Sequence, residues 1–148
     1  MGMFDGLEIS ASGLTAERMR MDVVAQNLAN AQTTRGANGQ PYRRQEVVLQ
    51  QRVPSGGFGA ALAGAMGTRT GSPGGVEVAT IAADQTPLKR VYDPGHPDAD
   101  ANGYVQMPNV DSVSEMVDLI SAQRAYEANV TAMQAAKQMF SKTLELLR

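Results

Sequence analysis

Residues 111–148 decide the fold, and they read DSVSEMVDLISAQRAYEANVTAMQAAKQMFSKTLELLR. The stretch contains neither proline nor glycine, and its large apolar residues recur every seven positions, at Leu119, Tyr126, Met133, Phe140 and Leu147. Such a recurrence places one narrow apolar stripe along a helix, as in the seam of a coiled coil. The stretch therefore predicts one helix about 50 Å long, begun by a capping box of Ser112 and Glu115.

A second helix is predicted at the other end of the chain, over residues 4–31. Its large apolar residues also recur every seven positions, at Leu7, Leu14, Met21 and Leu28. Amides, threonines and Gly36 follow, and they weaken a helix. The two helices predict a mainly α fold with a small β part, in which the N- and C-terminal helices pack as a coiled-coil-like pair.

The C-terminal helix also has apolar residues away from its main stripe, namely Val113, Met116, Val117, Ile120, Met139 and Leu146. One stripe needs one partner helix, whereas a broader apolar circumference needs several. The N-terminal helix provides one partner. We therefore expect the others to come from further subunits, with the two seven-residue series as the packing residues.

The middle of the chain differs from both ends. Residues 42–52, 76–83 and 88–92 are short runs typical of strands, and residues 55–75 form a glycine-rich loop that we expect to be flexible. The region has too few large side chains for a sizeable core. The predicted organisation is a discontinuous helical core, residues 1–35 and 107–148, with a β-rich connecting segment over residues 36–106.

Composition excludes several classes of protein. The 148 residues carry 13 Lys and Arg against 15 Asp and Glu, so the basic patch of a nucleic-acid binder is not expected. There is no cysteine and one histidine, His96, which leaves no thiolate metal site and little basis for a catalytic triad. No stretch is long and apolar enough to cross a bilayer, and the N-terminus lacks the features of a cleaved signal peptide. We expect no enzyme activity and no cofactor.

Residues 98–103, DADANG, match the first half of an EF-hand calcium loop. The twelfth loop position should be glutamate but is Asn109, and Pro94 and Pro97 prevent the entering helix. The interpretation is a hydrogen-bonded turn without a metal. A calcium-binding module is kept as one alternative function, and a small closed coiled-coil adaptor as another.

Residues 27–34, NLANAQTT, follow the N-terminal helix and resemble a signature of the flagellar rod, hook and hook-associated proteins. Residues 39–44, 92–111 and 115–129 are similar to the proximal-rod members of that family. The residues that carry the resemblance are Asn27, Leu28, Ala29, Asn30, Thr33, Pro41, Tyr42, Asn102, Gly103, Tyr104, Pro108, Asn109, Val110, Asp111, Glu115 and Met116.

The resemblance implies a structural subunit of the proximal rod of the bacterial flagellar basal body. Such a subunit assembles helically into a hollow shaft that transmits torque and conducts exported subunits. The implied partners are the rod proteins FlgB, FlgF and FlgG, the junction protein FliE, the basal-body rings and further copies of the chain. The resemblance also implies export by the flagellar type III apparatus, without a cleaved signal peptide, to a rod in the periplasmic space.

Overall fold

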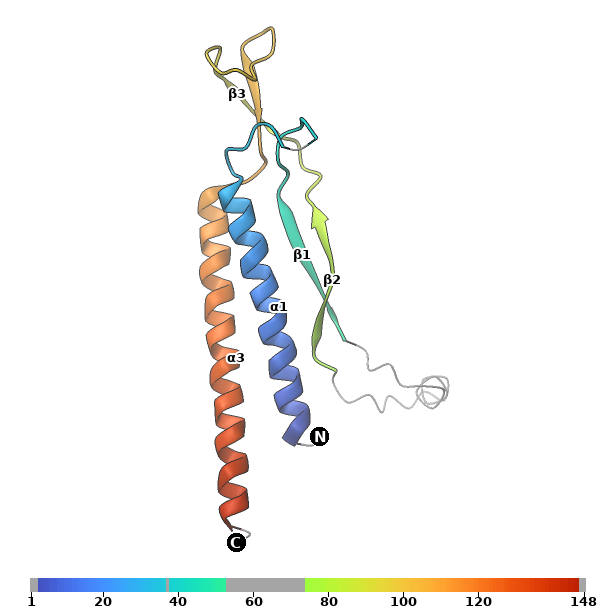
Figure 1. The fold of residues 1–148 in the computed structure, drawn as a ribbon, viewed down its shortest axis with the longest axis vertical. Helices are drawn as coiled ribbons and strands as arrows, with labels where there is room; N and C mark the ends of the chain where they lie inside the picture. The colour runs from blue at the N-terminus through green and yellow to red at the C-terminus, as the bar shows by residue number, and fades with distance from the viewer. Residues whose placement is uncertain (1–2, 37, 53–73, 147–148) are drawn as a thin grey trace, which may run out of the picture. The chain divides into compact units, whose positions relative to one another are not determined.

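A computed structural model describes residues 3–36, 38–52 and 74–146 of the chain. Within these residues, two long helices lie toward the ends, α1 (Met3–Ala29) and α3 (Ser112–Leu146), with four strands between them. The strands are β1 (Gln45–Gln51), β2 (Val76–Ala83), β3 (Lys89–Tyr92) and β4 (Tyr104–Met107). The mainly α fold class is confirmed (Figure 1). Most of the predicted flexible loop, and Leu147, lie outside the described residues.

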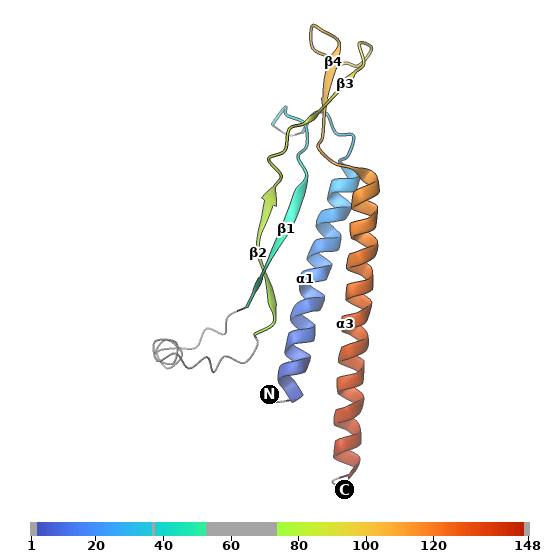
Figure 2. The same cartoon turned by 180° about the vertical axis from the view of Figure 1, so that it is seen from behind.

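The chain forms two compact units, each of which combines parts of both helices with strand residues. The first contains Met1–Arg18, Leu49–Ala79 and Arg124–Arg148, and the second contains Met19–Val48 and Thr80–Gln123. Within each unit, α1 and α3 lie side by side and run in opposite directions (Figures 1 and 2). The division into a helical core and a β-rich segment stays a prediction.

In the first unit, a glycine allows α1 to approach α3 closely. A Cβ atom added to Gly13 would lie 3.0 Å from the Nδ2 atom of Asn129 on α3. Glycine inside a helix costs about 1 kcal/mol relative to alanine. Close packing against Asn129 explains why glycine, rather than the better helix former alanine, occupies this position.

The strands form two antiparallel pairs, β1 with β2 and β3 with β4. In the first unit, the start of β2 is held against α1 by Ser12. The Ser12 Oγ atom accepts a hydrogen bond from the Val76 amide at 3.0 Å and donates one to the Ile9 carbonyl at 2.7 Å. Gly75, which directly precedes Val76, has a φ of 80°.

Replacing Gly75 with alanine is expected to release β2 from α1. The new Cβ would overlap the Ser12 Oγ atom, and the positive φ adds strain of about 1–2 kcal/mol. We expect the Val76 amide, which Ser12 protects, to exchange its hydrogen at least about tenfold faster. Gly39→Ala is the matched control, because Gly39 has a φ of 71° and no atom within 4 Å of an added Cβ. Equal protection of Val76 in both variants would contradict the Ser12 contact.

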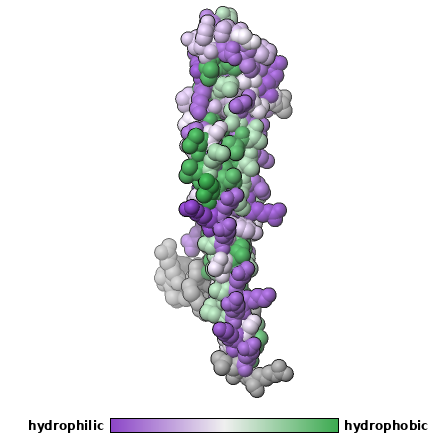
Figure 3. Space-filling view, turned by 90° about the vertical axis from the view of Figure 1, so that its left-hand side faces the viewer, coloured by the Kyte–Doolittle hydropathy of each residue, from purple (hydrophilic) through white to green (hydrophobic). Residues whose placement is uncertain are grey.

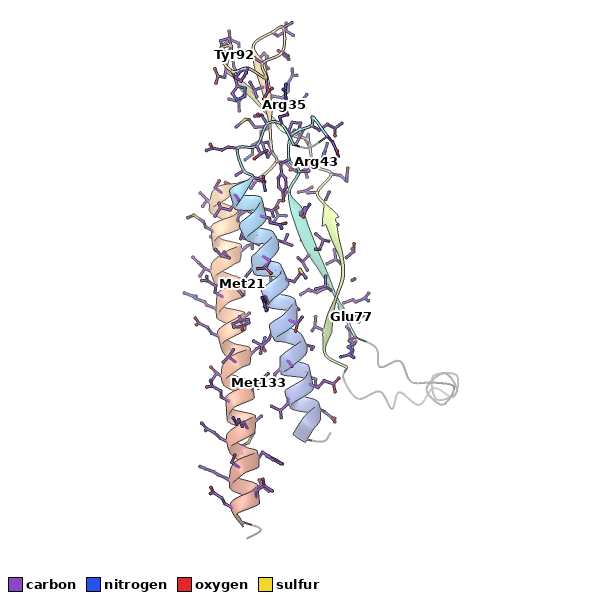
Figure 4. All side chains as sticks on the ribbon, in the orientation of Figure 1. Met21, Arg35, Arg43, Glu77, Tyr92 and Met133 are labelled. Atoms are coloured by element: carbon purple, nitrogen blue, oxygen red, sulfur yellow. The ribbon has the colours of Figure 1, made fainter. Side chains whose placement is uncertain are left out.

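The predicted packing series occupy the flanks of the helices rather than their most buried positions. Leu7, Leu14, Met21, Leu28, Leu119, Tyr126 and Met133 are half-buried, and Phe140 is exposed. Figure 4 marks Met21 on α1 and Met133 on α3. The fully buried apolar helix residues are instead Ala16, Val23, Val24 and Ala122. Subunit packing by these series stays a prediction.

Candidate assembly surface

Asn27, at the end of α1, is the centre of a buried polar network in the second unit. Its Nδ2 atom donates hydrogen bonds to the Gln45 carbonyl at 2.8 Å and to Glu115 Oε2 at 3.0 Å. Its Oδ1 atom accepts hydrogen bonds from the Tyr42 hydroxyl and the Gln45 amide, both at 2.9 Å. A carboxamide has two donor hydrogens and two acceptor lone pairs, so every hydrogen-bonding position of this side chain is used.

The carboxylate of Glu115 is fully buried and is paired with a cation. Its Oε1 atom accepts a hydrogen bond from Arg44 Nε at 2.6 Å, and Arg44 Nη2 lies 3.4 Å from Asp118 Oδ2. The hydrogen bond to Glu115 raises the pKa of the Arg44 guanidinium, which keeps this group charged. Burial, and then the charge of Glu115, raise the pKa of Tyr42. The phenol therefore retains the proton that it donates to Asn27.

The backbone of Arg44 extends the network to the segments around residues 84–86 and 109. Its amide donates to Asn109 Oδ1 at 2.8 Å, and its carbonyl accepts from the Asp84 amide at 2.8 Å. The Asn109 Nδ2 atom donates to Thr86 Oγ1 at 2.8 Å. Three segments that are distant in sequence, at residues 44, 84–86 and 109, thus meet at Arg44 and Asn109.

The first turn of α3 is capped by Asp111. Its carboxylate accepts hydrogen bonds from the Val113 amide at 3.3 Å and the Ser114 hydroxyl at 2.9 Å. These bonds, that from Ser114 first, lower the pKa of Asp111. The predicted capping box of Ser112 and Glu115 is therefore wrong, because Asp111 caps the helix and the Glu115 carboxylate belongs to the buried network.

The network fixes which face of α3 is exposed. Glu115, Asp118 and Ala122 are spaced three or four residues apart, so they share the face that meets Arg44 and α1. The opposite face of these turns is apolar and exposed. We call it the α3 apolar face, and it comprises Val113 (70% exposed), Met116 (54%), Val117 (61%) and Ile120 (50%). It is the hydrophobic cluster over α3 in Figure 3.

The calcium-loop pattern forms a turn. The Asp100 Oδ1 atom accepts hydrogen bonds from the amides of Asn102 at 2.8 Å and Tyr104 at 3.0 Å. Gly103 has a φ of 78°, which its position in this turn requires. His96 belongs to the same loop, and its Nδ1 atom accepts a hydrogen bond from the Asp98 amide at 3.1 Å.

Asp98 is the first residue of that pattern, and its carboxylate contacts the segment after α1. It accepts a hydrogen bond from Thr34 Oγ1 at 2.8 Å and lies 2.7 Å from a guanidinium nitrogen of Arg35. Within the described ranges, no group of three or more acidic, histidine or cysteine side chains is placed to hold a metal ion. Neither α1 nor α3, over the residues described, is long and apolar enough to span a membrane.

Comparisons with known proteins match the regions that build this site. Residues 7–37 match the family described as flagella basal body rod protein, and residues 101–146 match the C-terminal region of flagellar basal body rod FlgEFG proteins. The chain is 51% identical to the flagellar basal-body rod protein FlgC of Bacillus subtilis, over 99% of both chains. It is 44% identical to FlgC of Borreliella burgdorferi, over 100% of this chain and 99% of the relative. It is 45% identical to FlgC of Salmonella typhimurium, over 99% and 98%.

The chain belongs to the FlgC family of flagellar basal-body rod proteins. It is accordingly a structural subunit of the flagellar basal-body rod, as the resemblance implied. The residues that carry the resemblance fall largely in the two matched regions, and several of them belong to the site described above. Asn27, Tyr42, Asn109 and Glu115 are members of the buried network, and Met116 lies on the α3 apolar face.

The sequence did not indicate the roles of Arg44 and Gln45 in the buried network. The Arg44 side chain pairs with Glu115, which lies 71 residues further along the same chain. Arg43, labelled in Figure 4, donates to the carbonyls of Asp84 at 3.3 Å and Thr86 at 3.4 Å. Glu115 shares a face of α3 with Ala122, and a buried carboxylate requires a cation, but nothing in the sequence indicates which cation it is.

Proposed function

We propose that the chain is a subunit of the proximal part of the rod, and that it assembles helically into a hollow shaft that transmits torque and conducts exported subunits. Family membership supports a structural role in the rod, and the resemblance of residues 39–44, 92–111 and 115–129 supports the proximal position. The role that we propose is non-enzymatic and needs no cofactor.

The main structural support for the proposal is the exposure of the α3 apolar face. Val113, Val117 and Ile120 are each at least half exposed, although they lie on a well-capped helix. Burying such a side chain fully contributes about 1.5–3 kcal/mol. A contact between different faces of neighbouring subunits, where it does not close into a ring, generates a helical assembly. The α3 apolar face is therefore proposed to pack against a helix of a neighbouring rod subunit.

The partners follow from the same role. We propose contacts with the rod proteins FlgB, FlgF and FlgG, the junction protein FliE and the basal-body rings, after export by the flagellar type III apparatus. The helical core of residues 1–35 and 107–148 is proposed to form the subunit contacts. The residues that we assign to packing within and between subunits are Leu7, Leu14, Met21, Leu28, Leu119, Tyr126, Met133, Phe140 and Leu147.

Replacing Ile120 with aspartate is expected to block rod assembly without unfolding the protein. The side chain is half exposed, so the variant should keep its helix content and its urea midpoint. In the assembled rod the new carboxylate would be buried without a partner, which is costly. In cells that lack the native gene, we expect this variant to give membrane rings without a completed rod, seen by electron microscopy, and no swimming.

Ser121→Asp is the matched control, because Ser121 is an exposed polar neighbour on the same helix. It should support swimming at close to the normal rate. Complete rods built from Ile120→Asp would show that the α3 apolar face is not an assembly contact. Complete rods in cells without the gene would exclude the rod role itself.

A further inference from the structure

The outer face of α3 continues beyond its apolar residues into charged ones. Arg124, Glu127 and Thr131 follow Ile120 at steps of three or four residues, so they lie on the same side of this continuous helix. All three are exposed. Along this side, large apolar residues thus give way to a cation, an anion and then a hydroxyl.

The outer face of α1 has the complementary character. Arg18, Asp22, Ala25 and Ala29 recur at steps of three or four residues, and all are exposed. They lie on the opposite side of α1 from Asn27 and the other buried residues. This side therefore presents two charges followed by small side chains, into which larger ones can pack.

The four charges are available for contacts outside the chain. Within the described part of the chain, Arg18, Asp22, Arg124 and Glu127 take part in no ion pair. Consider α1 of one copy placed antiparallel to α3 of another. One register, to within one residue, then brings Asp22 opposite Arg124 and Arg18 opposite Glu127.

That alignment also matches the apolar parts of the two faces. Ile120 then lies opposite Ala25, and Val117 opposite Ala29, so each large side chain meets a small one. The antiparallel direction suits a helical assembly, in which every copy has the same orientation. Since α1 and α3 run in opposite directions within each unit, α1 of one copy is antiparallel to α3 of the next.

We propose that the outer face of α1 docks on the outer face of α3 of a second copy of this chain, with Asp22 paired to Arg124 and Arg18 to Glu127. The inference rests on the proposed function and names the partner of the α3 apolar face. A symmetric contact between two α3 helices fits less well. It also pairs Arg124 with Glu127, but it places Ile120 against Thr131.

Cysteine cross-linking tests this contact directly, because the native chain contains no cysteine. Two differently tagged copies are expressed together in cells, one with Ala25→Cys and the other with Ile120→Cys. Basal bodies that contain both tags are then purified and oxidised. We expect a disulfide-linked product that carries both tags, and none when either variant is expressed alone. A disulfide requires Cα atoms within about 7 Å, so this product reports the register.

Ala11→Cys paired with Ile120→Cys is the matched control. Residue 11 is exposed on the same side of α1 but lies about 20 Å from residue 25 along the helix, so no product is expected. In a second measurement, Asp22→Arg should lower the yield of the cross-link at least about fivefold, and Arg124→Asp in the same chain should restore it.

The other outcomes separate this inference from the rod role. Products between two Ala25→Cys copies or two Ile120→Cys copies would indicate a symmetric contact and overturn the inference. A product with a different rod protein, or no product in basal bodies that contain both tags, would also overturn it while leaving the rod role intact. Absence of the native chain from purified basal bodies would overturn both.

Discussion

Replacing Asn27 with aspartate is expected to destabilise the second compact unit by about 3–5 kcal/mol. The change removes both donors of the Nδ2 group, which serve the Gln45 carbonyl and Glu115 Oε2. It also puts a carboxylate oxygen about where Nδ2 lies, 3.0 Å from the fully buried carboxylate of Glu115. Two like charges in a buried site oppose each other strongly, since no solvent screens them. The measurement is urea unfolding at pH 7, followed by circular dichroism.

Gln26→Glu is the matched control for this variant. It makes the same change from amide to carboxylate one residue earlier, at an exposed position of α1. We expect it to cost less than about 1 kcal/mol, mostly from a negative charge near the C-terminal end of the helix. If both variants unfolded at the same urea concentration, the buried network would contribute nothing specific to the stability of the second compact unit.

The helices could be predicted from the sequence because their signals are local. A long stretch without proline or glycine and with regular apolar spacing predicts α3, which ends within the limits expected. The strand β2 agrees with its predicted range, because Val and Ile are dense there. The strand β4 was not predicted. It has four residues, and its pairing with β3 depends on the turn at Asp100 and Gly103.

The buried network could not be predicted in the same way. Helix periodicity places Asn27 on one face with Ala16 and Val23, which are buried, so its burial left a signal in the spacing. The partner of Glu115 left none, because Arg44 is 71 residues away and nothing local to either residue indicates the other. The local pattern suggested a capping box instead, and tertiary pairing overrode it.

The apolar character of the α3 apolar face could be predicted from the sequence, but its exposure could not. Val113, Met116, Val117 and Ile120 were predicted to lie off the packing stripe, and in the structure they are exposed. Their spacing alone did not separate an exposed face from one covered by the connecting segment. The position of Glu115 in the network decides this point, since it fixes the rotation of α3 about its axis. Contact with a neighbouring subunit stays a prediction.

Replacing Arg44 with methionine is expected to cost about 3–5 kcal/mol, because it leaves the Glu115 carboxylate buried without a cation. The backbone hydrogen bonds of residue 44 to Asn109 and Asp84 do not depend on the side chain, so the loss reports the ion pair. Urea unfolding at pH 7 measures it. Arg43→Met is the control and should cost about 1 kcal/mol, since its guanidinium donates to the neutral carbonyls of Asp84 and Thr86.

The double variant Arg44→Met, Glu115→Gln separates the ion pair from simple loss of contact. A neutral glutamine at position 115 still offers an oxygen to the Asn27 Nδ2 atom, but it no longer requires a cation. We therefore expect the double variant to be more stable than Arg44→Met alone, with a coupling of at least about 1.5 kcal/mol between the two sites. Strict additivity would mean that Arg44 stabilises the second compact unit through its packed aliphatic stem rather than its charge. Coupling would instead show that the charge pair of Arg44 and Glu115 stabilises the contact between the residue before β1 and the start of α3.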